Sequence, residues 1–220
     1  MTGDLVSVQV GKVQRLVMPE NARIDFRHPF WSSGIFKSAV EGKVRVTKMG
    51  IEGDEQADPE FHGGPDNVVL AYDAEHYPVW REELRMPELA FGGFGENFTV
   101  RRFTDDAVCI GDVWRVGGEL TLQVTQSRQP CFKLARRLRQ VEIVKRVKET
   151  SWGGWYLRVL CEGFAEAGMK IELVERVHPE WTVARAVQTM YARNKDVEQA
   201  KELAALPELS ARWKRELLED

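Results

Sequence analysis

The stretch Val113–Leu134 reads VWRVGGELTLQVTQSRQPCFKL and combines two strand patterns, a turn and a cysteine. Its apolar runs, Val113–Val116 and Leu120–Val124, flank the pair Gly117-Gly118. Two-residue hairpin turns need positive φ angles, which glycine adopts without steric cost. The sequence therefore predicts a β-hairpin here, whose second strand runs toward the cysteine.

Cys131 follows a proline and lies between two cations, Arg128 and Lys133. Nearby cations favour the thiolate, which is the form that binds metals and attacks electrophiles. Most isolated cysteines are instead small buried hydrophobic residues. These residues alone leave Cys131 open as a metal ligand, a nucleophile or a core residue. Cys109 and Cys161 stand in apolar, strand-like contexts, and we expect both in the core.

The rest of the chain up to residue 178 is dominated by short strand patterns separated by glycine turns, which predicts a barrel or a sandwich. The segment Phe132–Lys148 instead has apolar residues at helical spacing, and Asp73 is placed to cap a short helix that runs to about Leu84. The further strand patterns are Leu5–Val10, Ala39–Met49, Asn67–Tyr72, Trp155–Leu160 and Lys170–Val177.

Residues 179–220 contain no glycine and predict three helices. Pro179 is expected in the first turn of the first helix, Asp196 at the cap of the second, and Pro207 at the start of the third. A three-helix unit could be a DNA-binding domain of the helix-turn-helix type. This segment, however, has seven Lys/Arg against eight Asp/Glu, a net charge of 7 − 8 = −1, which is a poor surface for phosphates.

Composition excludes several classes of protein. The 220-residue chain has a formal net charge of −3, so it lacks the basic field of a nucleic-acid binder. Its three cysteines give neither a disulfide framework nor a paired zinc motif, which favours a reducing compartment. We find no signal peptide and no apolar run of membrane-spanning length, so we expect a cytoplasmic protein that does not bind membranes.

Common catalytic motifs are missing, but two loops could contact a ligand. The chain has no dinucleotide-binding glycine motif, phosphate-binding loop, hydrolase elbow or paired-histidine zinc motif. His62-Gly63-Gly64 could bring backbone and an imidazole to a ligand, or could be an ordinary turn. The loop Phe94-Gly95-Glu96-Asn97 has the same ambiguity. The acidic stretch 53–58 does not match a calcium-binding loop.

Seven motifs in order resemble the MOSC family, named for the C-terminal region of molybdenum cofactor sulfurase, and in particular its YiiM-like branch. The resemblance covers about Gly34 to Val177, and the helical tail resembles the 3-alpha unit of that branch. The motifs are GDEQAD (53–58), HGG (62–64), AEHYPVW (74–80), FGEN (94–97), CIGDVWRVG (109–117), LQVTQSRQPCFKL (122–134) and GWYLRVL (154–160).

The resemblance implies a mainly β fold, with a MOSC-type β-barrel and short peripheral helices over residues 1–178 and a three-helix domain over residues 179–220. It also implies binding of the molybdenum cofactor, a pterin that carries a dithiolene and a phosphate. Cys131 takes the position of the family's cysteine, as a molybdenum ligand or a sulfur carrier at the mouth of the barrel. The family is further associated with pyridoxal phosphate.

The implied reaction is reduction of N-hydroxylated bases such as 6-hydroxylaminopurine, with Cys131 and His62 as catalytic residues and His62 as the proton donor. No flavin or iron–sulfur motif is present, so a partner reductase must supply the electrons. The alternative is a non-catalytic carrier of the cofactor or of sulfur on Cys131. The oligomeric state stays open, with a homodimer as one possibility. The residues expected to hold the cofactor are Lys37, Gly63, Gly64, Asn97, Ser127, Arg128 and Lys133.

Overall fold

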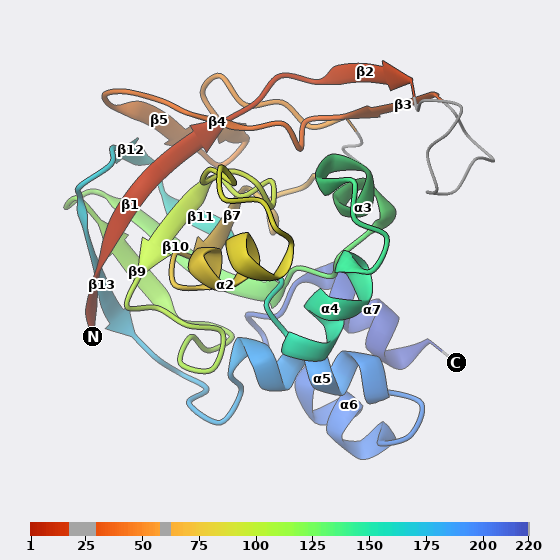
Figure 1. The fold of residues 1–220 in the computed structure, drawn as a ribbon. Coiled ribbons are helices and arrows are strands. Elements are labelled where there is room, and N and C mark those ends of the chain that lie inside the picture. Colours follow the sequence, from red (N-terminus) through yellow and green to blue (C-terminus); the bar gives the residue numbers. More distant parts are fainter. Residues whose placement is uncertain (18–29, 58–62, 220) are drawn as a thin grey trace.

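Seven strands close into a barrel in the computed structural model, which describes residues 1–17, 30–57 and 63–219 (Figure 1). The barrel closes because β1 pairs with β8 on one side and with β13 on the other. All neighbours are antiparallel except β7 and β8, which run parallel. Around the barrel the strands are β1 (Thr2–Val10), β13 (Lys170–Glu175), β9 (Val113–Val116), β10 (Leu120–Ser127), β11 (Trp155–Cys161), β7 (Val69–Asp73) and β8 (Phe98–Arg101).

The predicted hairpin is the β9–β10 pair, in which Leu120 lies opposite Val116. Gly117 and Gly118 have φ angles of 61° and 116°, as the turn requires. The fold class expected from the sequence is therefore confirmed, and of the two all-β alternatives the barrel is the correct one.

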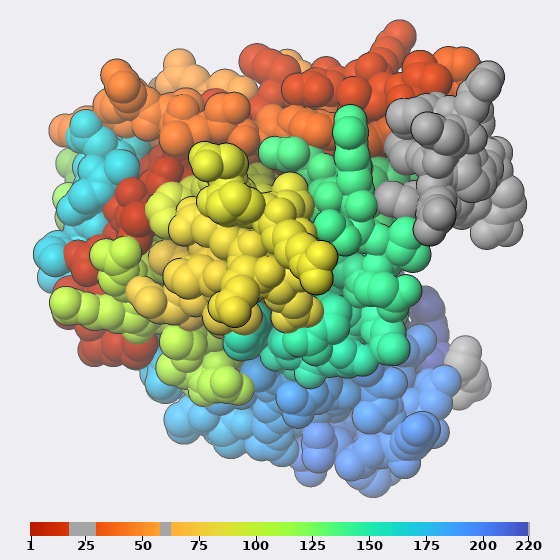
Figure 2. Space-filling view, viewed as in Figure 1, coloured from red at the N-terminus to blue at the C-terminus, as the bar shows by residue number. Residues whose placement is uncertain are grey.

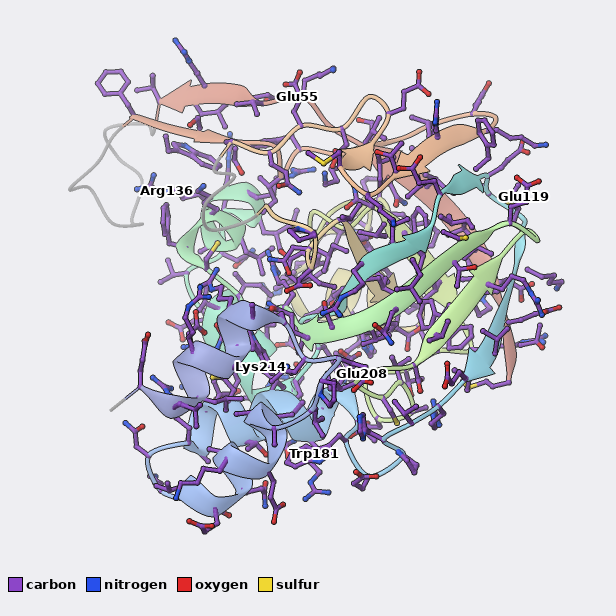
Figure 3. All side chains as sticks on the ribbon, turned by 180° about the vertical axis from the view of Figure 1, so that it is seen from behind. Glu55, Glu119, Arg136, Trp181, Glu208 and Lys214 are labelled. Atoms are coloured by element: carbon purple, nitrogen blue, oxygen red, sulfur yellow. The ribbon has the colours of Figure 1, made fainter. Side chains whose placement is uncertain are left out.

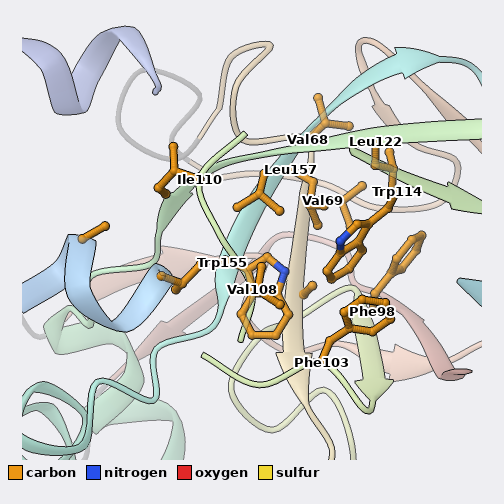
Figure 4. Close-up of a cluster of buried hydrophobic side chains, with 14 of the residues drawn as sticks. Val68, Val69, Phe98, Phe103, Val108, Ile110, Trp114, Leu122, Trp155 and Leu157 are labelled. Atoms are coloured by element: carbon orange, nitrogen blue, oxygen red, sulfur yellow. The ribbon is translucent and has the colours of Figure 1, made fainter. Parts of the chain in front are cut away.

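Large apolar side chains fill the inside of the barrel (Figure 4). Trp114, Trp155, Phe98 and Phe103 are all fully buried, and the rings of Phe103 and Trp114 lie 4.4 Å apart. A seven-strand barrel is narrow enough for its own side chains to occupy the interior. A ligand site must therefore lie outside this packed core.

Smaller strands lie outside the barrel. The predicted strand Ala39–Met49 is in fact divided between two short strands, and a third follows directly after it, because the chain turns between them. These are β4 (Ser38–Ala39), which pairs with β1, and β5 (Val44–Thr47) and β6 (Gly50–Ile51), which form a sheet with β12 (Gly163–Ala165). A separate ribbon consists of β2 (Gln14–Val17) and β3 (Phe30–Ser33).

Before the tail, the described residues form three short helices that pack on the outside of the barrel. Helix α2 (His76–Glu83) keeps Pro78 in its first turn, where proline is tolerated, and Asp73 accepts a hydrogen bond from the Glu75 N–H just before it. The predicted helix Phe132–Lys148 is wrong as a single element. It is divided into α3 (Phe132–Leu138) and α4 (Ile143–Thr150), because Arg139 adopts a left-handed conformation.

The tail forms the three predicted helices, α5 (Val183–Ala192), α6 (Val197–Ala204) and α7 (Ala211–Leu218). Asp196 caps α6 as predicted, through the Gln199 N–H at 3.0 Å. The prolines do not mark the other two starts: Thr182 and Ser210 are the caps, so α5 and α7 begin four residues after Pro179 and Pro207.

The tail is not a detached appendage. Tail residues such as Val187, Met190 and Trp213 belong to the same buried apolar cluster as Trp155 of the barrel. Figure 2 shows the tail lying directly against the α3–α4 segment over a continuous surface.

Candidate functional site

The candidate site is a pocket on the outer face of the barrel wall, with an open volume of about 630 Å³. Leu70 of β7 and Tyr156 of β11 line it. Successive side chains of a strand point to opposite faces, and the neighbours of these two residues, Val69 and Trp155, face the barrel interior. The pocket therefore lies outside the packed interior, and the expected site at the mouth of the barrel stays a prediction.

Cys131 lies on the pocket wall, half-buried, at the N-cap of α3. The Leu134 N–H donates to the Cys131 carbonyl at 3.0 Å, which fixes the backbone without using the thiol. The other two cysteines differ. Burial raises the pKa of Cys109 to about 11, so that this thiol stays protonated. Cys161 is exposed at the end of β11, and its predicted place in the core is wrong: it still pairs with Thr121 of β10, but a register shift beside that pair interrupts the alternation and the last two residues of β11 face outward.

Arg128 provides a buried cation at the pocket. Only 6% of it is exposed, and its Nη1 has no hydrogen-bond partner. Its backbone N–H donates to the Gly154 carbonyl at 2.8 Å, and its guanidinium lies near enough to the Tyr156 hydroxyl to oppose the effect of burial on the pKa of that group. A buried charge without a full set of partners is costly, so this guanidinium is available to an anion in the pocket.

Lys37 and Asp54 form a buried ion pair in the same pocket, each with 7% of its side chain exposed. Burial lowers the pKa of Lys37, and the Asp54 carboxylate opposes that effect. Asp54 also accepts hydrogen bonds from the Gly11 N–H at 2.8 Å and from Asn97 Nδ2 at 3.0 Å. Lys37 is thus already neutralised by the protein, unlike Arg128.

Asn97 lines the pocket, but its side-chain amide hydrogen-bonds other groups of the protein. Its Nδ2 donates to the Gln9 carbonyl as well as to Asp54, and its Oδ1 accepts from the Leu70 N–H. The structure therefore makes Asn97 a support for Asp54. The neighbouring Gly95 has φ 83° and packs so closely that a Cβ would lie 2.7 Å from Ile35.

Of the remaining predicted residues, Lys133 lines the pocket and three others do not. Ser127 is fully buried and donates to the Gly154 carbonyl. Gly63 and Gly64 lie next to the pocket, with their carbonyls accepting from Asn67, whose side chain does line it. His62 lies outside the described residues, so its role stays a prediction.

The sequence analysis missed Asp54 and Tyr156. Asp54 was considered only as part of a possible calcium loop, and no feature of the sequence pairs it with Lys37. Tyr156 could have been found from the alternation in Trp155–Leu160, which places it on the opposite face from Trp155 and Leu157. Burial raises the pKa of Tyr156, so its hydroxyl keeps its proton.

Ligand chemistry follows from this set of groups. Among the described residues, no three or more His, Cys, Asp or Glu side chains are grouped to hold a metal ion. A metal in this pocket would therefore rely on the Cys131 thiolate and on ligands that arrive with it. No helix in the described part of the chain is long and apolar enough to cross a membrane.

Comparisons with known proteins match both parts of the chain. The MOSC domain model matches residues 58–172, and the model of the YiiM-like 3-alpha helix domain matches residues 181–219. An uncharacterized protein, YflK of Bacillus subtilis, is 38% identical over 96% of this chain and 90% of its own length. Protein YiiM of Escherichia coli is 35% identical over 96% of this chain and 89% of its own.

A protein of Gibberella moniliformis named as a reductase is 37% identical over 80% of this chain, which spans only 32% of that larger protein. Among solved structures, YiiM from Geobacillus stearothermophilus superposes with a TM-score of 0.78 and 31% identity, covering 98% of this chain and 97% of that one. The chain belongs to the MOSC domain family, in the YiiM-like branch that carries the 3-alpha helix domain.

Proposed function

We propose that this protein binds the molybdenum cofactor at Cys131 and reduces N-hydroxylated bases, 6-hydroxylaminopurine among them, with electrons from a partner reductase. MOSC domains are associated with the molybdenum cofactor, and the fungal relative is named as a reductase. The observation that carries the proposal is the presence of a thiol and a buried, incompletely partnered guanidinium in one pocket.

The residues of the pocket fit the cofactor. A thiolate suits a metal that already carries dithiolene sulfurs, and Cys131 is the cysteine that lines the pocket. The phosphate matches Arg128, whose Nη1 lacks a partner, and Lys133 beside it.

Reduction of an N–OH group to an amine consumes two electrons and two protons and releases water. When bound, the cofactor supplies the two-electron chemistry. The chain supplies binding and protons: Cys131 holds the metal, Arg128 and Lys133 hold the phosphate, and His62 is the expected proton donor. Tyr156 keeps its proton because burial raises the pKa of its hydroxyl, so it can donate a hydrogen bond into the pocket.

The proposal is tested with protein produced in a cofactor-competent host and supplied with reduced methyl viologen. Conversion of 6-hydroxylaminopurine to adenine is followed chromatographically. Cys131→Ser should lose conversion, whereas Cys161→Ser, which removes an exposed thiol at the far end of β11, should keep it. Cofactor-loaded wild type that reduces neither this compound nor other N-hydroxylated bases would refute the reductase and favour the carrier function.

A further inference from the structure

The start of α7 is joined to the strand that leads to Cys131. Ser210, which is 1% exposed, donates its hydroxyl to Gln126 Oε1 near the end of β10 and accepts from the Trp213 N–H. The Ser210 N–H also donates to the Thr125 carbonyl at 3.1 Å. One serine therefore caps a tail helix and binds two consecutive residues of a barrel strand.

Two further connections surround this serine. The Ala211 N–H donates to the Asp66 carboxylate at 3.0 Å, and the other oxygen of that carboxylate pairs with Arg158 at 2.8 Å. Arg158 of β11 also donates to the Glu208 carbonyl at 2.8 Å. Figure 3, which labels Glu208 and Lys214, shows the start of α7 beside the ends of the barrel strands.

Three of the residues in this junction, Gln126, Asp66 and Arg158, lie within two positions of a residue that lines the pocket. Gln126 precedes Arg128 by two positions, and Asp66 directly precedes Asn67. Arg158 follows Tyr156 by two positions, and alternate residues of a strand share a face. The tail thus contacts three separate segments of the chain that lead to residues of the pocket.

Tail side chains also approach the charged groups of the pocket. Tyr191 of α5 lies near enough to Arg128 for the guanidinium to oppose the effect of burial, which raises the pKa of this tyrosine to about 12. Arg212 of α7 lies near Tyr156 and acts on its hydroxyl in the same sense. The surroundings of Arg128 therefore include the tail as well as the barrel.

We infer that the three-helix tail is part of the Cys131 site, with Ser210 as a positioning residue that fixes the Gln126–Cys131 segment and thereby places Arg128 and Cys131. The inference rests on the proposed function only in taking Cys131 and Arg128 as the working residues. It predicts that a substitution that removes the Ser210 cap alters the pocket, whereas a substitution that removes a helix cap elsewhere in the tail does not.

The experiment compares Ser210→Ala with Asp196→Ala in the full-length chain. Both remove a helix cap of the tail, but only Ser210 contacts β10. Hydrogen exchange of the backbone amides of residues 125–134 is measured by mass spectrometry. Loss of the cap and of the buried hydrogen bond should speed exchange there by about tenfold or more. Asp196→Ala should leave exchange in this segment within about twofold of wild type, and Ser210→Thr, which keeps the hydroxyl, should restore protection.

Molybdenum and pterin content is the second measurement, and it should fall by at least about half in Ser210→Ala and stay at the wild-type level in Asp196→Ala and Ser210→Thr. If Ser210→Ala does not fold, Gln126→Met breaks the same contact from the barrel side. Equal effects of Ser210→Ala and Asp196→Ala, or unchanged exchange in Ser210→Ala, would overturn the inference. Wild type without cofactor would refute the proposed function alone, because exchange still decides the role of the tail.

Discussion

At the scale of single residues, the two buried cations of the site differ in their hydrogen-bond and ion-pair partners. Lys37 has its counter-charge in Asp54, whereas Arg128 Nη1 lacks a partner although the residue is almost fully buried. Functional sites often keep such costly groups because a ligand later satisfies them.

Arg128→Met should therefore reduce cofactor content without destabilising the protein. Removing a buried cation whose Nη1 lacks a partner should leave the free energy of unfolding of the cofactor-free protein unchanged or raise it by up to about 1 kcal/mol. Urea denaturation measures this. The matched control is Arg158→Met, which breaks the contacts with Asp66 and Glu208 and should lower stability. Equal losses in the two variants would contradict the distinction between them.

Asp54→Asn should be strongly destabilising, because it leaves the buried Lys37 ammonium without its counter-charge. The expected loss is about 3–5 kcal/mol at neutral pH, and the double variant Lys37→Met/Asp54→Asn should recover part of it. A double variant no more stable than Asp54→Asn would show that the ion pair is not the cause.

The Lys37–Asp54 pair also makes the stability of the folded protein depend on pH, and the direction of that dependence follows from the pKa of Lys37. The pKa of Lys37 is lowered in the folded state below its ordinary value of 10.5, so between the two values the unfolded chain binds more protons. Stability must then rise with pH in that window. Relative to Lys37→Met, wild type should gain stability as the pH approaches 10.5, measured by urea denaturation. A relative loss over that range would contradict the lowered pKa.

Part of this site could be predicted from the sequence, and the reasons are local. Arg128, Cys131 and Lys133 are close in sequence, so their chemistry is visible without a fold. The Lys37–Asp54 pair depends on two loops that meet only in the tertiary structure. Asn97 was predicted as a ligand contact because an amide can bind either a ligand or the protein, and only the structure shows that it supports Asp54.

At the scale of elements, local patterns located most strands but misplaced several boundaries. The hairpin at Gly117-Gly118 was predictable because its turn demands glycine. The break between α3 and α4 was not, because Arg139 adopts φ 54° although nothing in its residue type requires it.

Arg139→Gly should therefore stabilise the protein by about 0.5–1 kcal/mol, since glycine takes the left-handed C-cap conformation without steric cost. Arg139→Ala makes the useful comparison, because it removes the same side chain and keeps the strain. Thermal unfolding should place the glycine variant above the alanine variant. The reverse order would mean that the Arg139 conformation carries no strain.

At the scale of the whole molecule, the tail and the barrel share one apolar cluster, although the sequence suggests a separate appendage. The change from glycine-rich to glycine-free composition at residue 178 marks a change of secondary structure. It does not show how much surface the two parts bury together, which only the fold reveals through residues such as Trp213.

Unfolding should consequently be a single cooperative transition. Calorimetry of the wild type should give one peak with equal calorimetric and van't Hoff enthalpies. Trp213→Ala should lower its midpoint as a whole, since it removes about 3–5 kcal/mol of buried packing from the common cluster. Two separate peaks, only one of them shifted by the substitution, would show that the tail folds by itself.

The central claim is that Cys131 holds the molybdenum cofactor in the pocket beside Arg128. The most direct test is the molybdenum and pterin content per chain of protein produced anaerobically in a cofactor-competent host. We predict close to one of each for the wild type and for the exposed-thiol control Cys161→Ser, with molybdenum lost in Cys131→Ser. Full molybdenum content in Cys131→Ser, or none in the wild type, would contradict the account.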